Sequence, residues 1–281
     1  MDKNYKRMRG FTLVELVTVI VILGILATSM TSFLRFGTQS YTDAADREEL
    51  ISTARFVVER LNREVRNALP NSARVIGSTC LEYIPVNESA IYLDIPVAPE
   101  PASSAITLAP FASALVNNSS KISIYGLDTN DLYSNTDNGV IANFNPDTML
   151  SLTPLHTPVG LSSSSAIVTL TLNNAIAFNA NSPTERLYFI EAPVSYCFEN
   201  ESIFRYDNYL DATGNYAYDA DGTPSITDAT RVLMAQNVQS AAFSVVNATL
   251  QRNSLVQVNF RFFQNLETIE FNNEIQVTNV P

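Results

Sequence analysis

Residues 9–27 read RGFTLVELVTVIVILGILA, and this stretch decides how the chain is anchored. A glycine stands before an apolar run that extends to residue 34 and holds a single charged side chain, Glu15. About 20 apolar helical residues cross the hydrocarbon core of a bilayer, which is about 30 Å thick. The run therefore predicts a membrane-spanning helix over residues 11–34.

The residues before this run predict which way the helix crosses. Lys3, Lys6, Arg7 and Arg9 should stay in the cytoplasm under the positive-inside rule, which leaves the rest of the chain outside. A cleaved secretory signal or a plain signal anchor is the simple alternative, because small residues at 27–32 offer a cleavage site. Glu15 argues against this alternative, because an ionisable group inside a membrane-spanning helix is energetically costly and usually has a function.

A second helical pattern covers residues 35–70. Opposite charges four residues apart, at Arg55–Glu59, Glu59–Arg63 and Arg60–Glu64, favour a helix surface. We expect one continuous helix over residues 11–69, with Pro70 as its stop and Gly24 and Gly37 as its weakest points. The apolar residues of an inward-facing stripe recur at three- and four-residue steps: Leu50, Ala54, Val57, Val58, Leu61, Val65 and Leu69.

Residues 71–281 read as strands and loops, which predicts an α+β fold with a mainly antiparallel, β-rich head on the long helix. The clearest strand is SLVQVNFRFF, residues 254–263, whose alternation points Val256, Val258, Phe260 and Phe262 inward. Residues 268–277 are expected to pair with it. Residues 231–240 suggest a short helix, and residues 96–105 and 134–166 are expected to be mostly loop. Further strands are expected at 80–86, 90–97, 121–127, 166–172, 186–198 and 202–206.

The charge of the chain is unevenly distributed. The formal net charge is −11, and residues 71–281 hold seven Lys and Arg against twenty Asp and Glu, a net charge of −13. A surface of that sign repels phosphate backbones. We therefore expect no nucleic-acid partner.

The two cysteines, Cys80 and Cys197, fit one disulfide bond if the head is exported. Two buried free thiols are the alternative. Their bond would close a loop of more than a hundred residues.

The sequence offers no recognisable catalytic centre, so we expect no enzymatic activity. His156 is the only histidine, and CxxC, HExxH and P-loop patterns are absent. Residues 206–223 offer carboxylates for a calcium site, with Gly214 and Gly222 allowing tight turns. Its candidate ligands are Asp207, Asp211, Asp219 and Asp221, although a solvated acidic loop is the simpler interpretation.

The arrangement of Gly10, Phe11 and Glu15 before an unbroken apolar stretch resembles the class III signal of type IV pilins and type II secretion pseudopilins. The resemblance implies that residues 1–10 form a leader, that a prepilin peptidase cuts between Gly10 and Phe11, and that Phe11 becomes N-methylated. Glu15 then lies one helical turn from the new amine and would align neighbouring subunits. Residues 11–34 would lie first in the membrane and then in a filament core.

Shorter segments resemble minor pilins of mannose-sensitive haemagglutinin (MSHA) pili: ERLNREVRNALPNSARV (59–75), CLEYIPV (80–86), PVSYCF (193–198) and EIQVTNVP (274–281). The resemblance implies assembly with major and minor pilins, an inner-membrane platform with its ATPase, and a role in surface attachment. The head would lie in the periplasm and later on the cell surface. J-type minor pseudopilins of type II secretion have a similar plan. A signal-anchored periplasmic enzyme or binding domain is the alternative from another class. The chain departs from major pilins in lacking a C-terminal cysteine pair that closes a short loop.

Overall fold

The computed structural model describes residues 10–110, 121–143, 168–209, 216, 224, 230–246, 253–265 and 267–277. The chain forms two compact units, Met1–Glu49 and Leu50–Pro281, and helix α1 (Leu13–Arg66) contributes to both.

Helix α1 has 54 residues and is continuous through Gly24 and Gly37, where the sequence suggested weakness. It ends at Arg66, three residues before the predicted end. The reason is a change of hydrogen-bond partner: the Leu69 amide donates to the Ile84 carbonyl at 2.8 Å instead of continuing the helix. Helix formation therefore stops where the chain begins to pair with the head.

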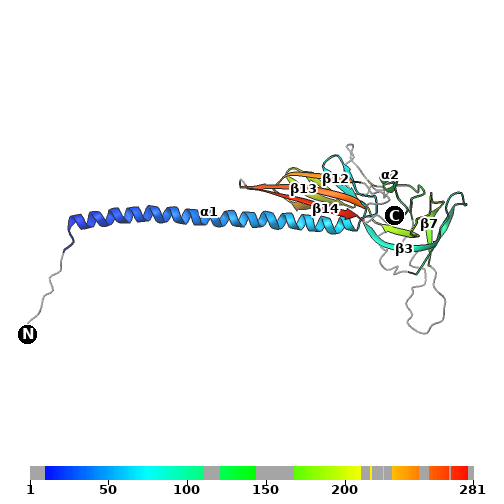
Figure 1. Ribbon diagram of the computed structural model, residues 1–281, viewed down its shortest axis with the longest axis horizontal. Coiled ribbons are helices and arrows are strands. Elements are labelled where there is room, and N and C mark those ends of the chain that lie inside the picture. The colour runs from blue at the N-terminus through cyan, green and yellow to red at the C-terminus, as the bar shows by residue number, and fades with distance from the viewer. Residues whose placement is uncertain are drawn as a thin grey trace, which may run out of the picture. The chain divides into compact units, whose positions relative to one another are not determined.

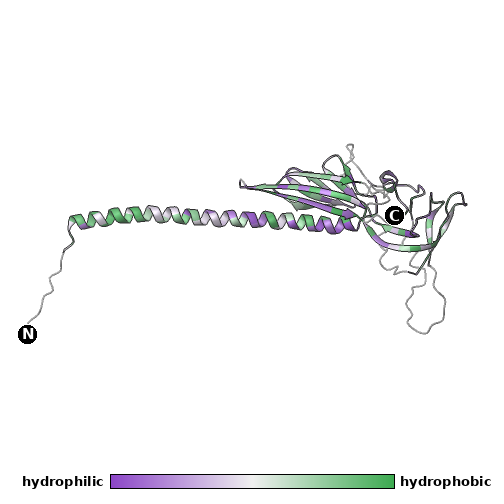
Figure 2. Cartoon of the chain, in the orientation of Figure 1, coloured by the Kyte–Doolittle hydropathy of each residue, from purple (hydrophilic) through white to green (hydrophobic). Residues whose placement is uncertain are grey.

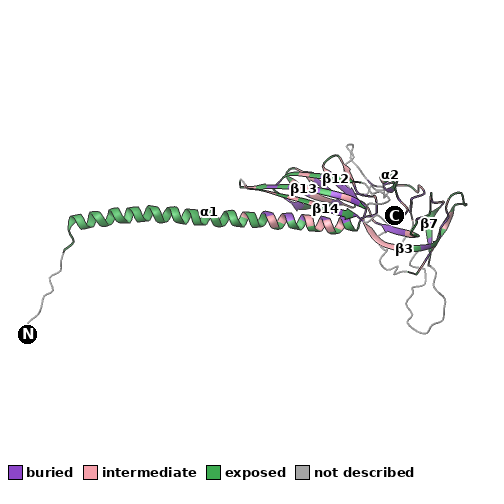
Figure 3. Cartoon of the chain, viewed as in Figure 1, coloured by how far each residue is buried: buried purple, intermediate pink, exposed green. Residues whose placement is uncertain are grey.

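The first turns of α1, residues 13–34, are mostly apolar and are exposed. Figure 2 shows the hydrophobic colour concentrated over the first turns, and Figure 3 shows the same turns as exposed. Among the described residues, α1 is the one helix that is long and apolar enough to cross a membrane. A helix that is hydrophobic on all sides needs lipid or other helices around it.

The described residues of the head form three antiparallel sheets and a short helix, α2 (Thr129–Leu132). The five-stranded sheet has the order β1 (Arg74–Ile76), β2 (Cys80–Tyr83), β9 (Val194–Glu199), β10 (Ser202–Asp207), β11 (Thr230–Ala235). The three-stranded sheet has the order β12 (Val238–Val246), β13 (Ser254–Gln264), β14 (Glu267–Val277). The six-stranded sheet has the order β6 (Ile141–Asn143), β5 (Lys121–Ile124), β8 (Arg186–Ile190), β3 (Val86–Asp94), β4 (Ser103–Leu108), β7 (Val168–Ile176).

The main core lies between the Leu50–Arg66 part of α1 and the sheets that pack on it (Figure 1). The predicted inward face of β13 is confirmed, because Val256, Val258, Phe260 and Phe262 are all buried. Phe260 makes edge-to-face contacts with Phe243 and Phe262. The helix contributes the stripe that the sequence predicted, with five buried residues within α1: Leu50, Ala54, Val57, Leu61 and Val65.

The pairing of β13 with β14 is confirmed over the full length of β14, from Gln264↔Glu267 to Ser254↔Val277. The predicted hairpin at residues 202–206 is also confirmed, since β10 pairs with β9. A second core lies within the six-stranded sheet and buries Ile106, Leu108, Ile122, Leu170, Phe178 and Phe189.

Three local predictions are wrong. Residues 231–240 form β11 and the start of β12 instead of a short helix, because β10 supplies a pairing partner (Arg205↔Val232) and Asn237 makes a turn with φ of 60°. Residues 186–198 are two strands, β8 and β9, which belong to different sheets. Part of the loop expected at 96–105 forms β4, which is held by β3 and β7.

Candidate functional site

The N-terminal end of the described chain presents an open peptide segment before the helix. Gly10 and Phe11 precede α1, and Phe11 is 71% exposed. A Cβ atom built on Gly10 would meet no neighbouring atom within 4 Å. The Gly10–Phe11 peptide bond is therefore sterically accessible.

Glu15 lies in the first turn of α1 and is exposed. Its amide donates a hydrogen bond to the Thr12 hydroxyl at 3.3 Å, and its carbonyl accepts one from the Thr18 hydroxyl at 3.0 Å. These contacts fix the backbone at the helix start and leave the carboxylate outward. An acid in the first turn also interacts favourably with the helix dipole.

Glu64 of α1 is the centre of a polar cluster in the head. Its carboxylate accepts hydrogen bonds from the Tyr83 hydroxyl at 2.6 Å and the Tyr196 hydroxyl at 3.0 Å. It also pairs with the Nε atoms of Arg60 at 2.9 Å and Arg205 at 3.0 Å. One helical carboxylate thus binds strands β2, β9 and β10.

The pKa values in this cluster follow from burial and hydrogen bonding. Burial raises the pKa of Glu64, but hydrogen bonds from Tyr83, Arg60 and Arg205 outweigh it and lower the pKa to about 2. Burial and the neighbouring Glu64 carboxylate raise the pKa of Tyr196 well above its ordinary range. The charges are therefore fixed near neutral pH, as expected for a structural clamp.

The predicted disulfide is present. Cys80 on β2 and Cys197 on β9 are directly opposite in the antiparallel register, with their Cα atoms 4.1 Å apart. Both cysteines are buried, and Tyr206 and Tyr209 pack in the same cluster. The bond joins positions 117 apart in sequence, so it covalently links two distant segments of one sheet.

A fully buried carboxylate, Glu82, lies near this bond on β2. It pairs with Arg74 and accepts a hydrogen bond from the Tyr209 hydroxyl at 2.6 Å. Sequence reasoning missed both Glu64 and Glu82 as head contacts. A signal existed only for Glu82, as an acid within the expected strand 80–86.

The calcium prediction stays untested. Asp207 forms an ion pair with Arg205. Asp211, Asp219, Asp221 and the lone His156 lie outside the described residues. Among the residues that are described, no three His, Cys, Asp or Glu side chains form a group that could hold a metal ion.

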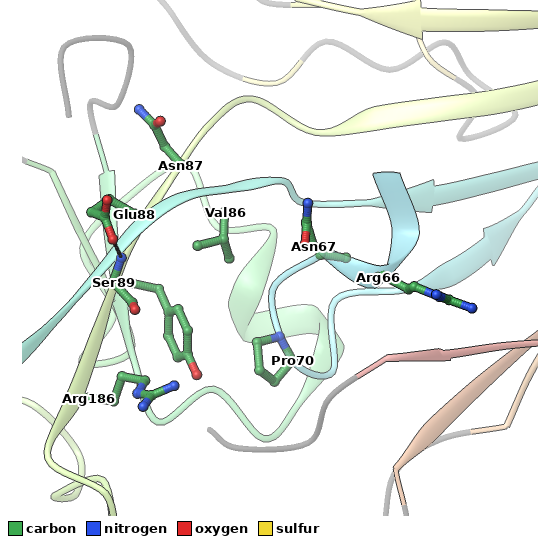
Figure 4. A pocket seen from close by; sticks show the side chains of 10 residues that line it. Arg66, Asn67, Pro70, Val86, Asn87, Glu88, Ser89 and Arg186 are labelled. Carbon is green, nitrogen blue, oxygen red and sulfur yellow. Dashed lines mark hydrogen bonds between the residues drawn. The ribbon is translucent and has the colours of Figure 1, made fainter. Parts of the chain in front are cut away.

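A cleft of about 400 Å³ opens where α1 ends. Figure 4 shows Arg186 and Ser89 on one side of it, and Asn67 and Pro70 on the other. Arg66, the last residue of α1, also borders the cleft. The lining is mostly polar and contains two arginines, Arg66 and Arg186, and one acid, Glu88.

The comparisons with known proteins bear on the N-terminal segment alone. Neither the curated proteins nor the solved structures include a match to the chain. Residues 5–31 match the prokaryotic N-terminal methylation motif. The matched range contains the exposed Gly10–Phe11 bond and Glu15, so the chain carries a type IV pilin-like signal at the start of its apolar helix.

Proposed function

We propose that the chain is a minor type IV prepilin that takes part in the initiation and assembly of an MSHA-type surface pilus. The observation that carries the proposal is the accessible Gly10–Phe11 bond, followed directly by an exposed apolar helix with one acid in its first turn. The methylation motif over the same residues supports it. The filament would serve surface attachment.

The chemistry begins with hydrolysis of the Gly10–Phe11 bond by a prepilin peptidase. Water adds to the carbonyl of Gly10, the leader leaves with a new carboxylate, and Phe11 gains a free amine. A methyl donor of the sulfonium class then transfers its methyl group to that amine, which loses a proton. Before assembly the apolar helix lies in the inner membrane with the head in the periplasm. An assembly platform with its ATPase then moves the helix from lipid into the filament core, among major and minor pilins.

Glu15 supplies the alignment in this proposal. Its carboxylate pairs with the Phe11 amine of its own chain or of an adjacent subunit. In an apolar medium such a pair is far less costly than either charge alone. A subunit shifted by one helical turn would leave both charges unpaired, so the pair selects one axial position.

Processing is the decisive test. The full chain, expressed with and without a prepilin peptidase, is analysed by N-terminal sequencing and intact mass. We expect a chain that starts at methylated Phe11 when the peptidase is present and an uncleaved chain when the bulky variant Gly10→Val replaces the wild type. A mature chain that begins elsewhere would favour a signal-anchored periplasmic enzyme or binding domain.

A deletion strain separates the pilus from the secretion system. Loss of surface filaments supports the pilus assignment. Intact filaments with a loss of protein secretion would instead support a J-type minor pseudopilin, whose long helix and β-rich head follow the same plan.

A further inference from the structure

Three arginines lie on the exposed side of the head part of α1. Arg55, Arg63 and Arg66 are exposed, and the residue numbers differ by eight and three, which places them on one side of the helix together with Glu59. The buried stripe that includes Val57 occupies the opposite side. Phe56 is 54% exposed on the arginine side. We call Arg55, Phe56, Glu59, Arg63 and Arg66 the arginine face.

The arginines of this face form no ion pair within the described residues, whereas other basic residues of the head do. The paired arginines are Arg60, Arg74, Arg205, Arg231 and Arg261. The buried Lys121 donates to the Ser134 carbonyl and lies over the Tyr216 ring. The arginine face therefore holds cationic charge that the chain's own fold does not use.

The cleft at the end of α1 extends this cationic surface. Arg66 borders it from the helix, and Arg186 borders it from β8. Arg186 also forms no ion pair within the described residues and hydrogen bonds to Tyr188. Asn67, Asn87 and Ser89 contribute polar groups (Figure 4). The cleft also holds one acid, Glu88, whose carboxylate accepts a hydrogen bond from the Ser89 amide, so its two arginines leave the lining with a net charge of +1.

We propose that the arginine face docks on the acidic head of a second copy of this chain. Charge complementarity carries the inference: the face has three Arg and one Glu, a net charge of +2, while residues 71–281 have a net charge of −13. Guanidinium groups bind carboxylates through two parallel hydrogen bonds. Phe56 supplies an aromatic anchor of the kind found at the centre of interfaces.

The contact is heterologous, because a basic helix face on one copy meets an acidic surface on the next. Each docked copy still presents its own arginine face, so association continues in one direction instead of closing as a symmetric dimer. The inference deepens the proposed function, and it rests on that function for the setting in which two copies meet.

Charge variants of the full chain in detergent test the contact by sedimentation velocity at low and high salt. We expect Arg63→Glu with Arg66→Glu to weaken self-association about tenfold, and raised salt to weaken the wild type similarly. Glu59→Gln is the matched variant, because it removes the only acid of the face and should strengthen association severalfold. A misfolded variant would not associate more strongly than the wild type. Association through the apolar helix would be unaffected by either the Arg→Glu variant or Glu59→Gln.

Photo-crosslinking locates the contact. A benzophenone amino acid replaces Phe56, and Tyr41, an exposed residue of α1 outside both the arginine face and residues 71–281, serves as the control position. We expect the Phe56 position to give a covalent dimer whose crosslinked peptide comes from residues 71–281. The proposal would be overturned by equal crosslinking at both positions, or by crosslinks that reach only the apolar helix or only a different subunit. An unchanged affinity for self-association in Glu59→Gln would also overturn it. A chain correctly processed at Phe11 that fails these tests retains its proposed function and loses only this contact.

Discussion

The carboxylate of Glu64 on α1 accepts a 2.6 Å hydrogen bond from the hydroxyl of Tyr83 on β2, although the helix ends only two residues after Glu64. Tyr196 and Arg205 bind the same carboxylate from β9 and β10. The end of the helix is therefore joined to three strands through one side chain.

Replacing Glu64 should destabilise the head. Glu64→Gln leaves Arg205 and Arg60 without their shared anion, and we expect the free energy of unfolding to fall by about 2–3 kcal/mol. Denaturant titration of the full chain in detergent, followed by near-UV circular dichroism, measures the change. Glu59→Gln, five residues earlier and exposed, should change stability by less than about 0.5 kcal/mol. Equal losses in the two variants would contradict the clamp.

The same carboxylate predicts how stability depends on pH. The folded-state pKa of Glu64 is about 2, below its ordinary value of 4.5, so the charged form is favoured in the folded protein. The contribution of the Glu64 carboxylate to the free energy of unfolding is fully present above about pH 4.5 and is lost as the pH falls through about 2. After solvent screening this contribution is about 2 kcal/mol. Unfolding titrations from pH 6 to pH 2 should show a shallower loss for Glu64→Gln than for the wild type. Parallel curves would show that other carboxylates dominate the acid response.

Removal of the disulfide should lower stability strongly. The bond between Cys80 and Cys197 joins positions 117 apart, and the chain-entropy treatment gives a stabilisation of about 4–5 kcal/mol for a loop of that size. The double variant Cys80→Ala with Cys197→Ala should therefore unfold at much lower denaturant concentration. Reduction of the wild type should give the same midpoint, whereas reductant should leave the double variant unchanged. A midpoint that is unaffected by both treatments would mean that the pairing of β2 with β9 is sufficient.

Replacing Glu15 should separate insertion from assembly. Glu15→Val makes the helix more apolar, so membrane insertion and cleavage after Gly10 should persist, but incorporation into filaments should fall at least tenfold because the alignment pair is lost. Immunoblots of sheared filaments and of membranes measure the two pools. Thr18→Val, which removes only a hydroxyl bonded to the Glu15 carbonyl, should assemble normally. Wild-type incorporation of Glu15→Val would remove the alignment role.

Periodic features of the fold were predictable from the sequence because each pattern lies within a single continuous segment. The stripe from Leu50 to Val65 and the alternation from Val256 to Phe262 each repeat with the period of one element, and both are buried as expected. The disulfide was predictable as a pairing because the chain has only two cysteines. Register and neighbours carry no such local signal.

The Glu64 cluster shows where sequence reasoning ends. Helical spacing correctly indicates the Arg60–Glu64 pair. The partners Tyr83, Tyr196 and Arg205 lie 19, 132 and 141 positions away, so no local pattern connects them. The misread segment 231–240 has the same cause, since β10 determines its conformation through pairing and its own composition does not.

The hydrogen bond from Asn273 on β14 to Asn62 on α1 spans 211 positions, and it has a consequence for how the protein is made. Strand β14 is synthesised about 211 positions after Asn62, at a ribosome speed of about 5–20 residues per second. The inward apolar stripe of α1 is therefore synthesised about 10–40 seconds before β14, the last strand of the sheet that packs on it. Premature termination anywhere before β14 would leave that stripe open to proteases and chaperones, so the cell would retain complete subunits and remove shortened ones.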